Sequence, residues 1–344
     1  MPNVLVTGGA GYIGSHTCLS LLENGYDVTI IENFSNSSPI AIDRVKLLSG
    51  KEISVEYGDI RNESFLESVF LKKENNNQQF DLVIHLAGVK SVSESVSNPL
   101  KYWDINLIGS QRLIAVMQNH KCKHILFSST STVYGNPTCF PLTEESLVDP
   151  LHPYAQSKYA VENMINALGR QENWNIGILR YFNPVGAHCS GLIGEDPLGI
   201  PDNLFPYLLQ VVSGKLEMLS VFGKDYPTPD GTGIRDYLHV MDLAEAHVDA
   251  VNYLLSQENG NSITLNIGTG KGLSVLDIIK GFEQATGKAI PYKFSEKRHG
   301  DVPKLEACPK KAAEVLGWSA KRSLIDMCKD GWAWQQANPN GYKT

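Results

Sequence analysis

The chain has 344 residues, of which 42% are hydrophobic and 19% are charged, a composition typical of a globular protein with a substantial core. Its net charge of −7 argues against nucleic acid or an anionic membrane as the main partner, but it does not exclude a local basic pocket. The six cysteines show no C-x-x-C spacing, so we expect neither a disulfide framework nor a zinc site.

The N-terminus predicts neither secretion nor membrane insertion. Met1–Thr7 runs straight into glycine-rich sequence, without the basic segment and apolar core of a signal peptide. No apolar run approaches the roughly 18 residues of a membrane span. We therefore expect a cytoplasmic protein in a reducing compartment. Its length exceeds that of most single domains, which favours one large domain and one smaller domain.

A short strand, Val4–Val6, is followed directly by a glycine-rich turn, Thr7–Gly14, and then by a helical stretch through Leu22. Glycines in such a turn allow the backbone to approach a pyrophosphate, whose charge the helix N-terminus favours. The glycines fit this pattern in two registers, at positions 8, 11 and 14 or at 9, 11 and 14. Between a strand and a helix, the pattern predicts a dinucleotide site.

The second strand, Asp27–Ile31, ends in Glu32 and Asn33, about 20 residues past the glycines. A carboxylate at this point accepts both hydroxyls of an adenine ribose and repels a 2′-phosphate, so we expect NAD rather than NADP. The alternative interpretation of Glu32 is an ordinary solvated loop acid.

Strands and helices then alternate without interruption. The expected strands are Ile53–Tyr57, Asp81–Gly88, His124–Phe127 and Asn175–Arg180, and the expected helices are Glu63–Lys73, Pro99–Asn119 and one that begins near Pro153. This alternation predicts a doubly wound parallel sheet of the α/β class, with polar residues gathered at the carboxyl ends of the strands.

The helix near Pro153 carries Tyr154 and Lys158, one turn apart and therefore on one face. A free phenol has a pKa of about 10, and a neighbouring ammonium favours the phenolate that general base catalysis requires. The fifth strand delivers Ser128–Thr130, whose Thr130 hydroxyl can bond a reacting oxygen. By itself the pair is a weak signal, because a surface lysine packed along an aromatic ring has the same spacing.

After about residue 184 the regular alternation of strands and helices ends. Glycine and proline are dense through Gly186–Pro206 and Gly223–Gly233, and loops of this length are usually functional. Two amphipathic helices, Met241–Leu255 and Val275–Thr286, are expected to pack with short strands such as Thr264–Ile267. We therefore expect an NAD-binding Rossmann domain over residues 1–184, to which some later segments return, and a smaller mixed α/β substrate domain over 185–344.

Four further blocks of sequence are spread over nearly the whole chain: Gly11–His16, Ser128–Gly135, Leu179–His188 and Asp230–Tyr237. Together with Tyr154 and Lys158 they resemble the extended short-chain dehydrogenase/reductase family and, within it, the UDP-glucose 4-epimerases. The last two blocks are far more specific than the glycine pattern.

The resemblance implies a set of site residues, each at a position that matches the family. Those that touch NAD would be Gly8, Gly11, Tyr12, Ile13, Gly14, Glu32, Asn33, Phe34, Ser35, Asn36, Ser37, Asp59, Ile60, Leu86, Ala87, Gly88, Val89, Lys90, Asn106, Thr130, Tyr154, Lys158 and Phe182. Those that hold the UDP-sugar would be Thr130, Tyr154, Asn183, Asn203, Arg235, Arg298, Asp301 and Leu305. Arginine forks suit pyrophosphate oxygens, and amides can recognise a uracil edge.

The activity implied is the interconversion of UDP-galactose and UDP-glucose. Tyr154 would take the proton of the sugar 4-hydroxyl while NAD takes hydride from C4, and the 4-keto sugar would turn over before hydride returns. Lys158 would lower the pKa of Tyr154 and hold the nicotinamide ribose. No metal, nucleic acid or membrane is implied. Family members pair through two long helices, here Pro99–Asn119 and Pro153–Arg170, so a homodimer is expected.

Three departures from the family pattern leave alternatives open. Glu32 replaces the usual aspartate, and Thr130 replaces the last of three serines. Leu305 is neither the bulky tyrosine that favours plain hexoses nor the small residue that admits N-acetyl groups. A nucleotide-sugar 4,6-dehydratase is a weaker alternative, because its Asp-Glu pair is replaced by Ser131-Thr132. A catalytically silent NAD-binding protein is the weakest, because both Tyr154 and Lys158 are present.

Overall fold

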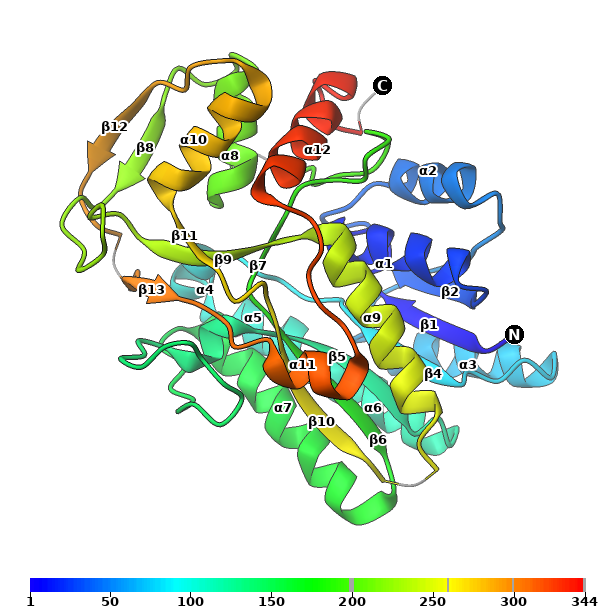
Figure 1. The fold of residues 1–344 in the computed structure, drawn as a ribbon. Helices are drawn as coiled ribbons and strands as arrows, with labels where there is room; N and C mark the ends of the chain where they lie inside the picture. Colours follow the sequence, from blue (N-terminus) through cyan, green and yellow to red (C-terminus); the bar gives the residue numbers. More distant parts are fainter. Residues whose placement is uncertain (198–200, 259, 299, 343–344) are drawn as a thin grey trace.

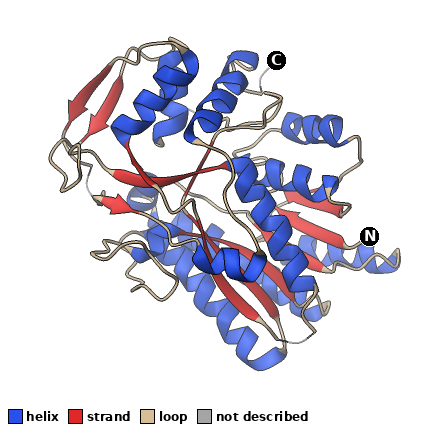
Figure 2. Cartoon of the chain, in the orientation of Figure 1, coloured by secondary structure: helices blue, strands red, loops and turns tan. Residues whose placement is uncertain are grey.

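A seven-stranded parallel sheet forms the centre of the molecule (Figures 1 and 2). The computed structural model describes residues 1–197, 201–258, 260–298 and 300–342. The strand order is β10-β6-β5-β4-β1-β2-β3, and every neighbouring pair is parallel. The strands are β1 (Asn3–Thr7), β2 (Asp27–Glu32), β3 (Ser54–Tyr57), β4 (Leu82–His85), β5 (His124–Thr130), β6 (Asn175–Tyr181) and β10 (Ser262–Ile267). The predicted doubly wound α/β sheet is confirmed.

Helices cover both faces of this sheet, because its central strands are apolar on both sides. One face is covered by α1 (Tyr12–Glu23), α2 (Pro39–Ser49), α9 (Val240–Leu255) and α11 (Lys310–Leu316). The other is covered by α3 (Glu63–Asn75), α6 (Gly109–Asn119) and α7 (Pro153–Glu172). Each layer buries one contiguous apolar cluster against the strands.

The helix expected over Pro99–Asn119 is a composite. It consists of α5 (Pro99–Tyr102), a π-helical segment (Trp103–Ile108) and α6, and a separate helix, α4 (Val92–Ser97), precedes it. The π-helical segment carries Asn106, whose buried amide is engaged with the backbone of another loop. A π turn widens the helix locally and often marks a functional position, which sequence periodicity did not reveal here.

Two elements from the second half of the chain, β10 and α9, pack with the first half. β10 pairs with β6 along its whole length, and α9 packs beside α1 on the same face of the sheet. The apolar residues of β10 complete the edge of the large sheet. The exact division of the chain into two domains stays a prediction.

The remaining elements form a smaller lobe. One small sheet joins β7 (Asn183–Val185), β9 (Ile234–His239), β11 (Gly272–Ser274) and β13 (Lys304–Leu305), and a second pairs β8 (Leu219–Phe222) with β12 (Tyr292–Ser295). Three helices, α8 (Leu204–Val212), α10 (Val275–Thr286) and α12 (Leu324–Ala337), pack with these strands around a separate apolar cluster. In Figure 1 this lobe lies beyond the carboxyl ends of the large sheet.

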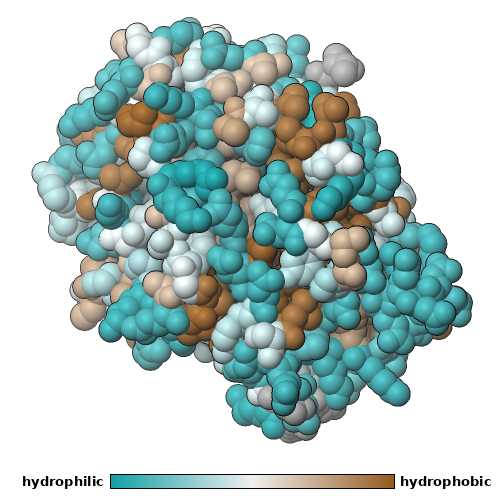
Figure 3. Space-filling model, turned by 45° about the vertical axis from the view of Figure 1, so that its right-hand side comes forward, coloured by the Kyte–Doolittle hydropathy of each residue, from teal (hydrophilic) through white to brown (hydrophobic). Residues whose placement is uncertain are grey.

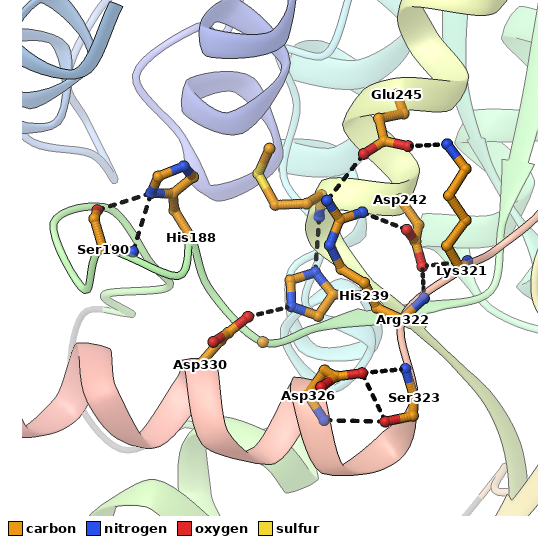
Figure 4. Close-up of polar contacts among 12 residues, drawn as sticks. His188, Ser190, His239, Asp242, Glu245, Lys321, Arg322, Ser323, Asp326 and Asp330 are labelled. Atoms are coloured by element: carbon orange, nitrogen blue, oxygen red, sulfur yellow. Dashed lines mark hydrogen bonds and ion pairs between the residues drawn. The ribbon is translucent and has the colours of Figure 1, made fainter.

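A polar cluster joins the C-terminal segment to α9 (Figure 4). The Asp242 carboxylate is fully buried and accepts the backbone N–H groups of Lys321 and Arg322 at 3.1 and 3.0 Å. Glu245, one turn later, pairs with the side chains of the same two residues, each at 2.9 Å. Ser323, the N-cap residue of α12, follows directly, so this cluster holds the start of that helix near α9.

The surface is mainly polar. Hydrophilic residues dominate the face shown in Figure 3, and apolar groups on it form separate patches. Among the described helices, none combines the length and apolarity that a membrane crossing requires. Within the same residues, no group of three or more histidine, cysteine or acidic side chains is arranged to hold a metal ion.

Candidate active site

The glycine-rich turn lies between β1 and α1, at the carboxyl edge of the sheet. Gly8 has φ of +76°, and a Cβ there would lie 2.8 Å from the backbone nitrogen of Ala87. A Cβ on Gly14 would lie 2.2 Å from the Gly8 oxygen, so the helix can approach the strand only without a side chain. Gly11 differs, because an added Cβ would meet only the Gly8 oxygen, at 3.3 Å.

Gly11 is also the N-cap of α1, and no side chain caps this helix. The first turn therefore presents backbone N–H groups and the positive end of the helix dipole. An anion fits this position, and the tight turn at Gly8 holds it next to the β4 edge. The turn accordingly has the features that a dinucleotide pyrophosphate requires.

Glu32 ends β2 beside this turn and is not a solvated loop acid, because its exposed fraction is 9%. Its carboxylate accepts the N–H groups of Asn33 at 3.0 Å, Phe34 at 3.1 Å and Ala10 at 3.3 Å. Burial raises the pKa of Glu32, and these backbone donors act in the opposite direction. The carboxylate thus lies at the mouth of the glycine turn, where an adenine ribose would need its acceptor.

The neighbouring adenine-side residues form a connected group. Asn33 donates to the Asp59 carboxylate at 3.0 Å, and Arg61 binds the same carboxylate at 2.9 and 2.8 Å. Arg61 thereby lowers the pKa of Asp59 to about 2. Phe34 has φ of 54° and stacks on the exposed ring of Tyr57, with 5.8 Å between centroids. Ser35 and Asn36 are exposed and Ser37 is partly buried beside them, while the Ile60 side chain lies in the core behind the site.

Asn106 joins the segment after β4, Leu86–Lys90, to α7. Its amide accepts the Val89 N–H at 2.9 Å, donates to the Val89 carbonyl at 3.1 Å and donates to the Ser157 hydroxyl at 3.0 Å. A Cβ on Gly88 would lie 2.9 Å from the Asn106 oxygen. The amide therefore already has protein partners and shapes the loop that faces the predicted nicotinamide position.

Lys90 reaches across to the smaller lobe. Its ammonium binds the carboxylate of Glu195 at 2.7 Å and lies 6.0 Å from the ring centroid of Tyr12. Glu195 is held in turn by Trp334, whose indole N–H donates to its carbonyl at 3.1 Å. Sequence reasoning missed Glu195, and only the density of glycine and proline around it marked this loop as functional.

Tyr154 and Lys158 lie in the first turns of α7. Pro153 occupies the first turn, and His152 caps the helix by accepting the Ala155 N–H at 3.2 Å while its ring stacks on Tyr154. Lys158 is 5% exposed, and its ammonium donates to the Ser128 carbonyl at 2.9 Å. The interpretation of Lys158 as an ordinary surface lysine is therefore excluded.

The electrostatics of the pair differ from the sequence expectation. Burial raises the pKa of Tyr154, and the groups that lower it are the Thr130 hydroxyl and the Lys90 ammonium. Burial lowers the pKa of Lys158 to about 8, against the effect of the Glu162 carboxylate. Lys158 is turned toward the β5 carbonyl, so in this structure Lys90 is the cation that favours the phenolate.

A buried polar network lies beneath these residues. Glu162, one turn after Lys158, accepts the hydroxyl of Ser129 and binds Arg180 at 2.7 and 3.1 Å. Arg180 also donates to the hydroxyl of Tyr134 at 3.0 Å. Sequence reasoning missed this network, although the four-residue spacing of Lys158 and Glu162 on one helix face could have indicated it.

The predicted substrate residues come from separate strands and loops of the smaller lobe. Arg235 in β9 forms a close ion pair with Asp301, and the Asp301 N–H donates to the Arg298 carbonyl at 3.2 Å. The Arg298 guanidinium lies 4.0 Å from the ring centroid of Phe222. The structure therefore brings Arg235, Arg298 and Asp301 together.

The other predicted substrate residues line adjacent segments. Asn183 begins β7, which pairs with β9, and Asn203 is an exposed N-cap residue of α8 whose side chain forms no capping hydrogen bond. Leu305 pairs in register with Arg235. The Leu305 side chain is 5% exposed and shares an apolar cluster with Phe182.

Known proteins are similar to this chain over nearly its whole length. A family model described as GDP-mannose 4,6 dehydratase matches residues 5–331. A UDP-glucose 4-epimerase of Bacillus subtilis is 50% identical over 342 residues, which cover 99% of each chain. The chain belongs to the UDP-glucose 4-epimerase family.

Solved structures of this family agree with the fold. The UDP-glucose 4-epimerase of Bifidobacterium longum, in complex with NAD⁺ and UDP, is 47% identical with a TM-score of 0.93, covering 98% of this chain and 99% of its own. That of Stenotrophomonas maltophila, with bound NAD and formylated UDP-arabinopyranose, is 44% identical with a TM-score of 0.95, covering 98% and 99%. The dehydratase alternative is not favoured, because the residues after Thr130 are Ser131 and Thr132, which begin a 3₁₀ helix.

Proposed function

We propose that this protein interconverts UDP-galactose and UDP-glucose by inverting the configuration at C4 of the sugar, with NAD as a resident cofactor. The observation that carries the proposal is the convergence of Tyr154, Lys158 and Thr130 at the sheet edge, next to the glycine turn. Arg235, beside Asp301, and Arg298, whose carbonyl accepts the Asp301 N–H, suit a diphosphate and support the UDP-sugar as substrate.

The residues divide the chemistry between them. When bound, NAD supplies the hydride acceptor and donor for C4 of the sugar. Tyr154 takes the proton of the 4-hydroxyl as general base and returns it as general acid. The Thr130 hydroxyl hydrogen-bonds the Tyr154 phenol and would bond the same sugar oxygen beside it. Lys90 provides the positive charge that a phenolate requires, while the Lys158 ammonium donates to the Ser128 carbonyl.

Inversion also requires that the hexose turn over while the nucleotide stays bound. Arg235, Arg298 and Asp301 would fix the UDP portion, whereas the hexose would meet mainly the apolar cluster that contains Phe182 and Leu305. Apolar surface imposes no directional bonds, so it permits both orientations of the sugar ring.

The deciding experiment is an NMR time course of the purified protein with UDP-galactose and no added cofactor. Formation of UDP-glucose supports a 4-epimerase that retains NAD. A parallel sample with UDP-N-acetylgalactosamine tests whether Leu305 leaves room for an acetamido group. Accumulation of a 4-keto-6-deoxy sugar would restore the dehydratase alternative, and no conversion even with added NAD would contradict the proposal.

The proposed assembly is a homodimer formed by the helical segments around α5 and α7. In support, this region exposes large apolar side chains, with Leu100 at 78%, Val96 at 61% and Ile108 at 43% exposure. Exposed large apolar side chains of this kind are common at protein interfaces. Sedimentation at micromolar concentration should give the dimer mass, and a monomer mass alone would remove this proposal. The six free cysteines support a reducing, cytoplasmic location.

A further inference from the structure

The hydroxyl of Tyr226 is buried and has no hydrogen-bond partner among the described residues. The residue is 7% exposed and lies in the loop between β8 and β9. Buried polar groups in folded proteins are nearly always paired, because an unmade hydrogen bond costs stability. A tyrosine hydroxyl left in this state therefore needs an explanation, and a bound ligand is one that can supply the partner.

The ring of Tyr226 is held firmly in place. Gly223 has φ of +82°, and a Cβ on it would lie 2.4 Å from the Tyr226 ring. The Lys297 ammonium lies 4.6 Å from the ring centroid, and the Tyr226 N–H donates to the Gly231 carbonyl at 3.0 Å. Contacts with the ring and the backbone hydrogen bond therefore hold Tyr226 in place, without a hydrogen bond to its hydroxyl.

The charged groups around the phenol are those of the proposed UDP-sugar site. Burial raises the pKa of Tyr226, Asp301 and Asp225 raise it further, and Arg235 and Arg298 lower it. Arg235 is occupied by Asp301, and Arg298 lies over Phe222 and donates to the Asp202 carbonyl at 3.1 Å. Arg298 directly follows Lys297, whose side chain packs on the Tyr226 ring, so the segment that carries this arginine contacts the tyrosine.

We propose that Tyr226 is a further substrate-binding residue, whose hydroxyl donates a hydrogen bond to a phosphate oxygen of the nucleotide diphosphate held by Arg235 and Arg298. The inference rests on the proposed function. A phosphate oxygen accepts and cannot donate at neutral pH, and a phenol is a good donor, so the two are matched. Hydrogen bonds to a charged acceptor are short and about twice as strong as neutral ones.

The test compares Tyr226→Phe with the unaltered protein, using UDP as the probe. Removing the hydroxyl should weaken UDP binding about ten-fold by calorimetry, because one charge-assisted hydrogen bond is lost. The ligand-free variant should melt at the same or a higher temperature, because it loses only an unpaired buried group. The rise in melting temperature caused by saturating UDP should consequently be smaller in the variant.

Tyr292→Phe is the matched control, because Tyr292 is in the same lobe, is 43% exposed and packs on Phe294. It should change neither UDP affinity nor stability. Unchanged UDP affinity in Tyr226→Phe would overturn the inference while leaving the proposed function standing. A fall in the melting temperature of the ligand-free variant would also overturn it, because the hydroxyl would then have a partner within the protein. Failure of the unaltered protein to bind UDP would instead remove the proposed function itself.

Discussion

Tyr154 combines a partly buried side chain with two groups that favour its ionised form, the Thr130 hydroxyl and the Lys90 ammonium. Its neighbours fix the ring independently of its hydroxyl: the His152 ring stacks at 6.0 Å, and the Tyr102 ring meets it edge-on at 6.4 Å. The hydroxyl is thus free for chemistry, whereas the ring is part of the structure.

Tyr154→Phe should therefore reduce turnover by about three orders of magnitude, the usual contribution of a positioned acid–base group. NAD content after purification and melting temperature should stay within error of the unaltered protein, because ring packing is preserved. Steady-state kinetics and the absorbance of the bound cofactor would measure both. Full activity in this variant would displace Tyr154 as the base.

Short-range patterns account for part of the site that the sequence predicts. The strand–glycine–helix pattern placed Gly8, Gly14 and Glu32 because all three lie within one βαβ unit. Glu195 and Tyr226 could not be found in this way, because each is in a long loop and reaches the site only through tertiary packing. The pKa of Tyr154 was likewise beyond the sequence, since burial depends on the whole fold.

At the scale of elements, the Glu162–Arg180 pair joins α7 to β6 directly beneath the proposed catalytic residues. Both side chains are almost fully buried, at 1% and 6% exposure. Glu162 also accepts the Ser129 hydroxyl, so the position of β5 relative to α7 depends on one carboxylate.

Glu162→Ala should lower the free energy of unfolding by about 3–5 kcal/mol, because it leaves the Arg180 guanidinium buried without its counter-charge. Denaturant unfolding followed by circular dichroism would measure the loss. The control is Glu314→Ala, which removes an exposed i,i+4 pair with Lys310 on α11 and should cost no more than about 0.5 kcal/mol. Equal effects of the two changes would contradict the assigned role of the buried pair.

A second link between elements is pH-dependent. His120, after α6, binds Glu67 at 2.6 Å and Glu74 at 2.9 Å, both in α3. Burial acts to lower the pKa of His120, but the two carboxylates more than offset it and raise the pKa above its ordinary value. The hydrogen bond from Asn119, followed by that from His120, lowers the pKa of Glu67.

These shifts fix the sign of the effect on stability. The contribution of His120 is complete below its unfolded pKa of about 6.5 and is lost as pH rises through the higher folded pKa. That of Glu67 is present above its unfolded pKa of about 4.3 and is lost as pH falls through the lower folded pKa.

His120→Gln should therefore lower the melting temperature by about 2 °C near pH 5.5, with a difference that disappears by pH 9. Scanning calorimetry of both proteins across this range would measure it. A difference that stays constant with pH would show that packing, and not charge, is the contribution of His120.

At the scale of the whole molecule, the chain passes repeatedly between its two lobes. Without β10, the β6 strand would be the edge of the sheet. Without α9, one face of α1 would be exposed. Both covering elements come from beyond residue 239, after the chain has built much of the smaller lobe. Sequence predicted the strand and the helix themselves, but the partner of each was fixed only by the complete core.

A fragment that ends at residue 184 should consequently fail as an independent unit. It would leave the β6 edge unpaired and the apolar groove of α1 open to water, which favours aggregation. We expect the fragment to be insoluble. If it is soluble, it should bind dyes specific for exposed apolar surface and give broad amide resonances. A fragment with sharp, dispersed resonances and bound NAD would contradict this expectation.

The interleaving also limits how the protein can be recombined. A chimera that exchanges the smaller lobe with that of a relative cannot use one junction near residue 184, because α9 and β10 would travel with the wrong partner. Junctions are required on both sides of the segment from Val240 to Ile267. The segment from Trp318 to Arg322 must come from the same parent as this one, because its contacts with Asp242 anchor α12 (Figure 4). The two lobes therefore cannot be exchanged independently of each other. A new sugar specificity is more readily acquired by single substitutions than by exchange of a lobe.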